Sequence, residues 1–452
     1  MMNLSSRKVM CKRQKQSSAC DEIKEGEDFI SKLPNALLIV ILSFLPEADA
    51  VRTCILSNRW KYIWAFLPNL SLVMPFCWST EEANQFHDFV DRILALRVGL
   101  SCRRFYLYCS KNCDYNRVYD CLCTVVKNKV EKIDLRFPAD RFIVKFCWDL
   151  FRTSYTLVQL TLRGEFVLDV PEAEVLFPCL KKLNLISIAY VGDQVVTNLI
   201  SGCPLLQELF VERQLIGHSD NMEMFKVTSH SLRRLRMSFA SCVDGDYKVV
   251  IDAPNLKYMS IVDFMSAHIT FTRPFLLFEA YIKTRPDINT EFLLPSLSSV
   301  RILNVTNWTL MALHNADVVH MPVFNNLVKL VIGLDPRYGW ILLADLFELM
   351  PKLEHLTLSD GIVPFPRAQH FYNIRWDPSV EAPHCLRFAM KEIVINNREA
   401  ITQEEFPLIR YLLRHSNQLE TLSINAHKIR SITRERLLKL YRGSALCRIE
   451  LI

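Results

Sequence analysis

The chain has 452 residues, of which 50% are hydrophobic, 11% aromatic and 23% charged, and this composition excludes a fibrous or largely disordered protein. Its length is sufficient for two or three folded domains. Lysine and arginine exceed aspartate and glutamate by only six, 54 against 48, so the charge balance does not indicate a nucleic acid or an acidic membrane surface as partner.

Glycines and cysteines narrow the possible chemistry further. The 11 glycines are never two or five residues apart, which excludes a GxGxxG dinucleotide loop and a GxxxxGK phosphate loop. The 15 cysteines are odd in number and scattered, which favours reduced thiols in the cytosol or nucleus over a secreted disulfide framework. A cluster of cysteines lacks paired CxxC motifs, so we interpret it as buried thiols and not as a zinc site. Its members are Cys102, Cys109, Cys113, Cys121 and Cys123.

The N-terminal segment shows no hydrophobic period. Residues 1–27 are polar and charged, and we expect a flexible tail there. The longest apolar run, Ala36 to Leu42, is too short for a membrane span, and no apolar segment follows the basic residues near the N-terminus. We therefore expect a soluble protein of the cytosol or nucleus, without a signal peptide.

The stretch over residues 28–70 predicts three short helices. In the first, apolar side chains recur at helical spacing between Pro34 near its start and Pro46 at its end. These side chains are Leu37, Leu38, Ile41, Leu42 and Leu45. A second helix is expected over residues 47–54 and a third from Ser57, a good N-cap. Three such helices are too small to bury their own apolar side chains, so we expect a partner surface, either the rest of the chain or another protein.

The same residues resemble an F-box of the plant type. The resemblance rests on Leu-Pro-x-x-Leu-Leu-x-x-Ile-Leu-Ser-Phe-Leu-Pro from Leu33, followed by Ala-Val-Arg-Thr-Cys-x-Leu-Ser-x-Arg-Trp-x-x-x-Trp from Ala50. It implies a module over residues 28–75 that binds a Skp-type adaptor and, through it, a cullin–RING ubiquitin ligase. Asn35 replaces a residue that is often acidic, and Cys54 one that is often a small hydroxyl residue. Neither lies on the apolar face, so no loss of binding is expected.

The resemblance also implies which side chains contact the adaptor. Those that match adaptor-facing positions of the family are Leu33, Pro34, Ile41, Leu42, Pro46 and Trp60. Four more either share that face or pack the helices together, and the sequence leaves both roles open. They are Leu37, Leu38, Leu45 and Trp64. Each large apolar side chain removed from water contributes about 1.5–3 kcal/mol, so a few such anchors can support an interface. The alternative is a helical hairpin packed on its own chain.

From about residue 100 a loose Leu-x-x-Leu-x-Leu unit recurs at intervals of about 26 residues, the length of a leucine-rich repeat. Its copies begin at residues 130, 157, 180, 206, 232, 256, 300, 327, 353, 390, 419 and 446. The interval of 44 residues after 256 leaves room for two units. Four prolines precede the first position of a unit by two residues, where a turn would end one element before the strand begins. They are Pro178, Pro204, Pro254 and Pro351.

Each unit predicts a strand, a loop and a helical or irregular return, and it buries its apolar face only when units stack. The expected fold class is therefore α/β, with a three-helix F-box followed by an irregular leucine-rich-repeat solenoid over residues 100–375. Helical returns are expected over residues 194–200 and 342–349. Polar side chains between the strand leucines are expected on the concave strand face. Examples are Gln159, Lys182, Glu208, Arg234 and His355.

Residues 376–452 form the last predicted part. A strand over 390–395, an amphipathic helix over 404–413 and a strand over 419–424 resemble the FBD module that closes many plant F-box/leucine-rich-repeat proteins. Pro407 departs from that pattern. The resemblance implies a terminal unit that covers the open end of the solenoid.

Taken together, the resemblance implies a substrate-recognition adaptor of a Skp–cullin–F-box ubiquitin ligase. The F-box binds the Skp-type adaptor, the repeats bind an unknown target protein, and proximity promotes ubiquitin transfer. The chain itself is not expected to be an enzyme, and no catalytic residue, cofactor or metal is predicted. An alternative from another class is an F-box protein outside the ligase, acting as a scaffold or as a receptor for a small ligand held in the solenoid.

Overall fold

The computed structural model describes most of the chain after residue 28. The described residues are 29–74, 79–97, 100–110, 112–137, 144–145, 148–151, 154–164, 166–170, 177–213, 222–239, 248–264, 268–273, 276–284, 294–306, 309, 322–334, 339–359, 381–397, 401, 405–426 and 429–452. The predicted tail over 1–27 lies outside them. The chain divides into two compact units, Met1–Leu67 and Pro68–Ile452.

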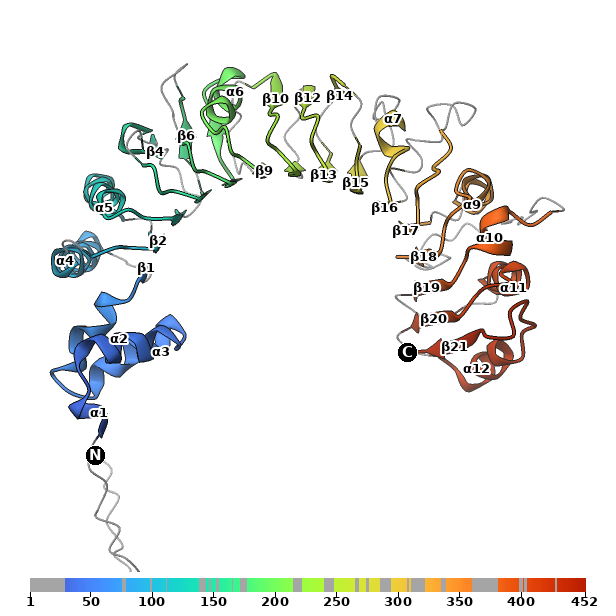
Figure 1. Cartoon of the computed structure of the whole chain (residues 1–452), viewed down its shortest axis with the longest axis horizontal. Coiled ribbons are helices and arrows are strands. Elements are labelled where there is room, and N and C mark those ends of the chain that lie inside the picture. The colour runs from blue at the N-terminus through green and yellow to red at the C-terminus, as the bar shows by residue number, and fades with distance from the viewer. Residues whose placement is uncertain are drawn as a thin grey trace, which may run out of the picture. The chain divides into compact units, whose positions relative to one another are not determined.

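The first unit is helical in its described part (Figure 1). Its elements are α1 (Phe29–Lys32), α2 (Asn35–Ser43), α3 (Glu47–Arg52), and the 3₁₀ helices η1 (Thr53–Ile55) and η2 (Trp60–Phe66). Pro34 and Pro46 stand directly before α2 and α3, where a proline loses no helical hydrogen bond. The third predicted helix begins at Trp60 and not after Ser57. The N–H of Trp60 donates to the carbonyl of Ser57 at 3.0 Å, which closes a tighter 3₁₀ turn.

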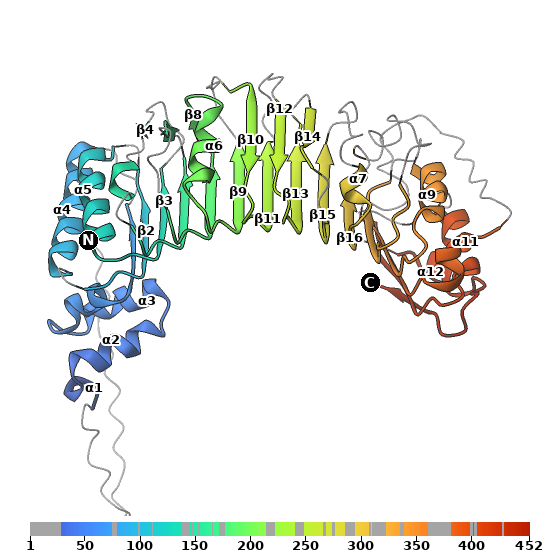
Figure 2. The same ribbon diagram turned by 45° about the horizontal axis from the view of Figure 1, so that its top comes forward.

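The second unit contains one sheet of 15 strands, each parallel to its neighbours (Figures 1 and 2). In spatial order the strands are β1 (Asn69–Val73), β2 (Arg104–Tyr108), β3 (Lys132–Arg136), β5 (Gln159–Arg163), β7 (Lys182–Ile186), β9 (Glu208–Arg213), β11 (Arg234–Phe239), β13 (Tyr258–Asp263), β15 (Glu279–Thr284), β16 (Ile302–Val305), β17 (Lys329–Ile332), β18 (His355–Leu358), β19 (Glu392–Asn397), β20 (Thr421–Ala426) and β21 (Arg448–Leu451). The order follows the chain, so each unit adds one strand beside the previous one.

The predicted repeat units agree closely with these strands. Every one of the twelve contains a strand of the large sheet, and β15 occupies the 44-residue interval in which two units had room. The sheet nevertheless begins at Asn69, before the predicted start of the repeats at residue 100. The segment from Leu67 to Leu72 also fits the pattern Leu-x-x-Leu-x-Leu, and β1 begins in it. This segment overlaps the end of the F-box-like stretch.

The four prolines lie in turns, as predicted. In each turn the residue two places after the proline donates its N–H to the carbonyl of the residue before the proline. The donors and acceptors are Leu180 to Phe177, Leu206 to Cys203, Leu256 to Ala253 and Leu353 to Met350, at 3.0 to 3.3 Å. Proline thus occupies the second position of a β-turn, where its restricted φ fits. These turns set the residue at which the next strand starts.

The described returning segments all lie on one side of the large sheet, and we call the opposite side its inner face (Figure 1). The helical ones are α4 (Thr80–Leu96), α5 (Tyr115–Lys127), η3 (Trp148–Phe151), α6 (Gln194–Ser201), α7 (Leu294–Leu297), α9 (Gly339–Glu348), α10 (His384–Phe388), α11 (Phe406–His415) and α12 (Ser431–Leu438). Two predicted returns, over 194–200 and 342–349, are thus helical. Others form small parallel sheets that were not predicted, from β4 (Val144–Lys145), β6 (Phe166–Leu168) and β8 (Ala189–Tyr190), and from β10 (Met224–Thr228), β12 (Lys248–Asp252) and β14 (His268–Phe271).

The core of the second unit lies between the large sheet and the returns. Strand residues alternate, so that leucines such as Leu160, Leu183 and Leu235 are completely buried while the polar residues between them face the other way. At the C-terminal end α11 packs on this core through Leu408, Ile409 and Leu412. No helix within the described ranges is long and apolar enough to cross a membrane.

Asp193, which precedes α6, connects that helix to the start of β10. Its Oδ1 atom accepts the backbone N–H groups of Glu223 at 2.9 Å and Met224 at 3.0 Å. We expect Asp193→Ala to lower the free energy of unfolding by about 1–3 kcal/mol, because two donors lose a charged acceptor. Asp193→Asn keeps an acceptor oxygen and should lose less than half as much. Urea denaturation measures both variants, and equal losses would contradict this role.

Candidate docking surfaces

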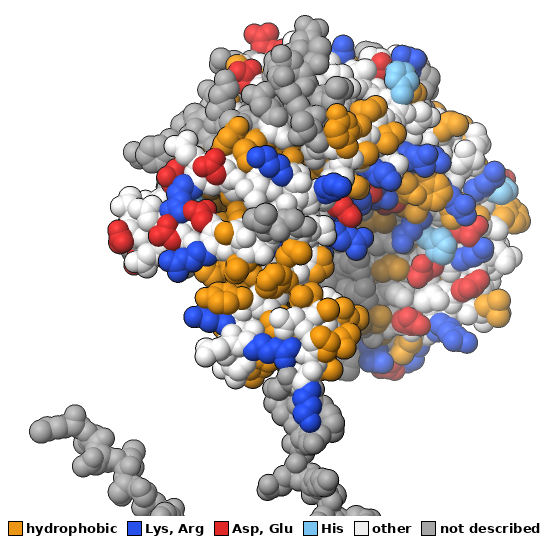
Figure 3. Space-filling view, turned by 60° about the vertical axis from the view of Figure 1, so that its left-hand side comes forward, with side chains coloured by type: hydrophobic (Ala, Val, Ile, Leu, Met, Phe, Trp, Pro, Cys, Tyr) orange, Lys and Arg blue, Asp and Glu red, His pale blue; other side chains and the backbone are white. Residues whose placement is uncertain are grey.

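Helix α2 carries apolar side chains on two adjacent faces, about 100° apart around the helix axis. Leu38 and Leu42 are buried, at 0% and 1% exposure. Leu37 and Ile41, one helical turn apart, and Leu45, which follows the end of the helix, are 49%, 45% and 41% exposed. We call these three side chains the exposed α2 face. Figure 3 shows hydrophobic side chains gathered on the surface of this first unit.

The ten side chains predicted to contact an adaptor fall into three groups. Pro34, Leu37, Ile41, Leu45 and Pro46 are exposed, Leu33 is half-buried, and Leu38, Leu42, Trp60 and Trp64 are buried. Leu42 and Trp60, which the resemblance assigns to the adaptor, are buried inside the unit, at 1% and 6% exposure, and their role as contacts stays a prediction. They are buried because α2 packs on η2, and both side chains lie within the helical packing of the unit.

Arg59 connects the start of α2 to the segment before η2. Its Nε and Nη2 donate to Oδ1 of Asn35 at 3.0 and 2.9 Å, and Nη2 also donates to the carbonyl of Leu33. The amide oxygen of Asn35 accepts these bonds in the way a carboxylate oxygen at this position would. The sequence contains both partners but does not indicate that residues 24 positions apart meet.

Three further apolar side chains of the first unit were not predicted as contacts. Phe44, Ile55 and Leu56 are 82%, 84% and 62% exposed, more than Leu37. Phe44 follows α2 directly, and Leu56 follows η1. They enlarge the exposed apolar surface of this unit, which is unusual for a folded protein in water unless a partner covers it.

On the second unit, the strand register places polar residues in rows across the inner face of the sheet. Gln159, Lys182, Glu208 and Arg234 are successive partners in one row, as predicted for this face. Lys182 Nζ forms an ion pair with Glu208 Oε2 at 2.9 Å. His355 lies further along the sheet, with its Nδ1 at 3.0 Å from Glu392 Oε2.

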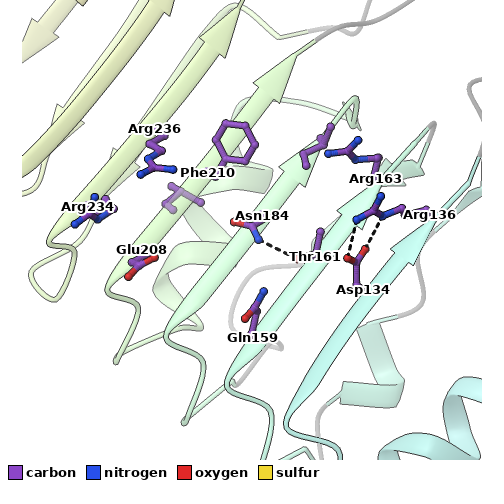
Figure 4. A pocket seen from close by; sticks show the side chains of 12 residues that line it. Asp134, Arg136, Gln159, Thr161, Arg163, Asn184, Glu208, Phe210, Arg234 and Arg236 are labelled. Carbon is purple, nitrogen blue, oxygen red and sulfur yellow. Dashed lines mark hydrogen bonds and ion pairs between the residues drawn. The ribbon is translucent and has the colours of Figure 1, made fainter. Parts of the chain in front are cut away.

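A hollow of about 350 Å³ opens on this face over β3, β5, β7, β9 and β11 (Figure 4). Four arginines and one phenylalanine belong to its lining, and they are Arg136, Arg163, Arg234, Arg236 and Phe210. At one end Arg136 donates through Nε and Nη2 to both carboxylate oxygens of Asp134, each at 3.2 Å. Next to it Asn184 Nδ2 donates to Thr161 Oγ1 at 2.9 Å. Sequence periodicity predicted the face but not this hollow.

Four of the five cysteines in the cluster are buried as predicted, and the fifth, Cys123, is half-buried. Cys102, Cys109, Cys113 and Cys121 have free thiols, and burial raises the pKa of Cys102 and Cys121. Cys113 differs, because a hydrogen bond with the Cys109 thiol, together with His87 at 3.6 Å, lowers the pKa of Cys113. Among the described residues, no group of three or more histidine, cysteine or acidic side chains is arranged to hold a metal ion.

The sequence neighbours His384 and Cys385 do not form a pair. The Cys385 thiol is fully buried and donates to the carbonyl of Phe347 at 3.3 Å. Burial raises the pKa of Cys385 to about 12, so it is protonated at neutral pH. The His384 ring instead packs against Phe388, with ring centroids 4.9 Å apart. This arrangement does not activate a thiolate nucleophile.

Comparisons with known proteins agree with both parts of the chain. The F-box domain model matches residues 30–72, and the model for the leucine-rich repeats of FBD-associated F-box protein At5g56370 matches residues 120–273. Two putative F-box/FBD/LRR-repeat proteins of Arabidopsis thaliana, At5g44950 and At3g49030, are 30% and 28% identical to this chain. The first alignment covers 88% of this chain and 92% of the relative, and the second covers 90% and 89%. The helical N-terminal unit, the repeated parallel strands and these matches together show that the chain belongs to the F-box/FBD/leucine-rich-repeat protein family.

Proposed function

We propose that this protein is the substrate-recognition subunit of a Skp–cullin–F-box ubiquitin ligase in the cytosol or nucleus. In this proposal a three-helix F-box over residues 28–75 binds a Skp-type adaptor. The repeats over 100–375 and an FBD-like end over 376–452 form one solenoid, which binds the target protein. The chain performs no chemical step, and it promotes ubiquitin transfer by holding a target lysine near a ubiquitin-loaded enzyme.

The exposed α2 face supports the adaptor-binding part of this proposal. Leu37, Ile41 and Leu45 each leave more than two fifths of their surface in water, although Leu38 and Leu42 on the adjacent face of α2 are buried. A short helix with apolar side chains beyond its buried face is stabilised when a second protein covers them. Pro34 and Pro46 lie at the two ends of this face and are also exposed.

The test is binding of the full chain to a purified Skp-type adaptor, measured by isothermal titration calorimetry. We expect Ile41→Asp to reduce affinity at least 100-fold, because a carboxylate would be buried without a partner at the centre of the interface. The matched control is Ile432→Asp on α12 of the other unit, where the side chain is 72% exposed. This control should bind like the wild type.

Circular dichroism establishes that both variants are folded. If the folded wild-type chain does not bind the adaptor, the proposal is overturned, and the scaffold or small-ligand receptor becomes the better account. Equal loss of affinity in both variants would show that the exposed α2 face is not the binding surface.

A further inference from the structure

The hollow on the inner face of the sheet has a charge that indicates what kind of target segment it accepts. Four basic side chains belong to its lining, and they are Arg136, Arg163, Arg234 and Arg236. Two carboxylates accompany them in the lining, Asp134 and Glu208. Four positive charges minus two negative ones leave an excess of two in a hollow that crosses five strands. Such an excess attracts an acidic partner.

The two carboxylates already have partners, which leaves specific arginines available. Asp134 accepts both bonds from Arg136, and Glu208 forms the ion pair with Lys182. Arg163 and Arg236 are exposed and form no ion pair with any residue that the structure describes. A guanidinium in this state presents its paired N–H groups to an incoming carboxylate.

Two other arginines are held in place by aromatic rings. The guanidinium of Arg234 lies 4.2 Å from the ring centre of Tyr258, and that of Arg136 lies 5.1 Å from the ring centre of Tyr106. Stacking of this kind restricts the side chain without neutralising its charge. Arg234 is therefore positive and partly ordered before a partner arrives, whereas the charge of Arg136 is balanced by Asp134.

Apolar side chains lie between the two unpaired arginines. The strand register places Ile186 beside Arg163 and Phe210 beside Arg236 (Figure 4). Arg163 and Arg236 are three strands apart, which corresponds to about 15 Å. An extended peptide covers that length in four to five residues, with its first, third and fifth side chains on one side.

The other end of the same face lacks these features. On β18 and β19 His355 is bonded to Glu392, and on β19 and β20 Asn396 Oδ1 accepts from Asn425 at 2.7 Å. On β20 and β21 Ser423 donates to Glu450 at 3.3 Å. Each of these side chains is bonded to one on the next strand, so charge complementarity favours the part of the sheet near β5 to β11.

We propose that this hollow binds an extended acidic segment of the target protein, in which two acidic side chains flank an apolar one. The acidic side chains pair with Arg163 and Arg236, and the apolar side chain between them packs on Phe210 and Ile186. This inference rests on the proposed function, because it names the class of target that the repeats bind.

The test uses the full chain and a pool of 12-residue peptides with a fixed Glu-x-Leu-x-Glu core and randomised flanks. Enriched peptides are measured by fluorescence anisotropy against the matched Gln-x-Leu-x-Gln pool. We expect binding only of the acidic pool, weakened at least tenfold in Arg163→Glu/Arg236→Glu. The control is Lys329→Glu, an exposed lysine on the inner face of β17 with no ion pair to a described residue, and it should change affinity less than twofold.

Three results would overturn the inference. They are the absence of enrichment from the acidic pool, equal weakening by Lys329→Glu, and displacement of the peptide by inorganic phosphate at equal concentration, which would indicate a site for a bare anion. Adaptor binding by the same variants separates this inference from the proposed function. If the Arg163→Glu/Arg236→Glu chain and the wild type both bind the adaptor while no acidic peptide binds, only the inference on the target class fails.

Discussion

Gly164→Ala is expected to lower the free energy of unfolding by about 3 kcal/mol. Gly164 follows β5 and has φ of +118°, a conformation that side chains disfavour. A Cβ atom there would lie 2.1 Å from the carbonyl oxygen of Phe137. The backbone cannot easily move away from this contact, because the N–H of Gly164 donates to the carbonyl of Ile186 at 2.9 Å. Urea denaturation of the full chain measures the loss.

The control for this prediction is another glycine of the same unit. A Cβ atom on Gly192 has no neighbour within 4 Å, and its φ lies outside the strained range. Gly192→Ala should therefore change the free energy of unfolding by less than about 1 kcal/mol. If both alanine variants shift the urea midpoint equally, the cost at Gly164 does not come from contact with Phe137.

Leu42→Ala is expected to destabilise the helical unit by about 2–4 kcal/mol, whereas Ile41→Ala should have a small effect on its stability. Leu42 is 1% exposed, and its removal leaves a cavity between helices. Ile41 is 45% exposed, so truncation mainly removes surface that is already in water. Hydrogen exchange by mass spectrometry of residues 29–67 within the full chain measures the local stability of this unit in each variant.

These neighbouring positions also separate packing from docking. Ile41→Ala should weaken adaptor binding without faster hydrogen exchange, and Leu42→Ala should speed exchange throughout the unit. If Leu42→Ala left the exchange unchanged, Leu42 would not be a packing residue, and the role that the resemblance implied for it would be the better one.

The repeated strands were largely predictable because one local rule creates them. Each strand needs apolar residues at fixed spacing, and twelve repeat units have leucine or a similar side chain at these positions. Strand β15 was hidden because Ala280 occupies the middle apolar position of its unit, after Leu277 and before Ile282. Strand β2 has Cys102 and Phe105 where leucines are expected. Small or aromatic side chains can fill these core positions, but a search for leucines at fixed spacing does not find them.

The sequence predicted an apolar stripe on the first unit but not which of its side chains are exposed. Leu37, Leu38, Ile41, Leu42 and Leu45 all fit this stripe, and nothing in it tells which of Ile41 and Leu42 faces η2. That choice depends on how two helices pack, which is a contact between distant parts of the sequence. The bonds from Arg59 to Asn35 and Leu33 depend on the same packing.

The parallel register of the large sheet separates the side chains that stabilise it from those that face a partner. Buried leucines alternate with inner-face residues along every strand, and each inner-face residue has one neighbour per adjacent strand. A substitution at one inner-face position therefore alters one point of contact and leaves the hydrophobic core intact. Such a surface can change one strand at a time, so the inner face can vary in sequence while the strands that carry it are kept.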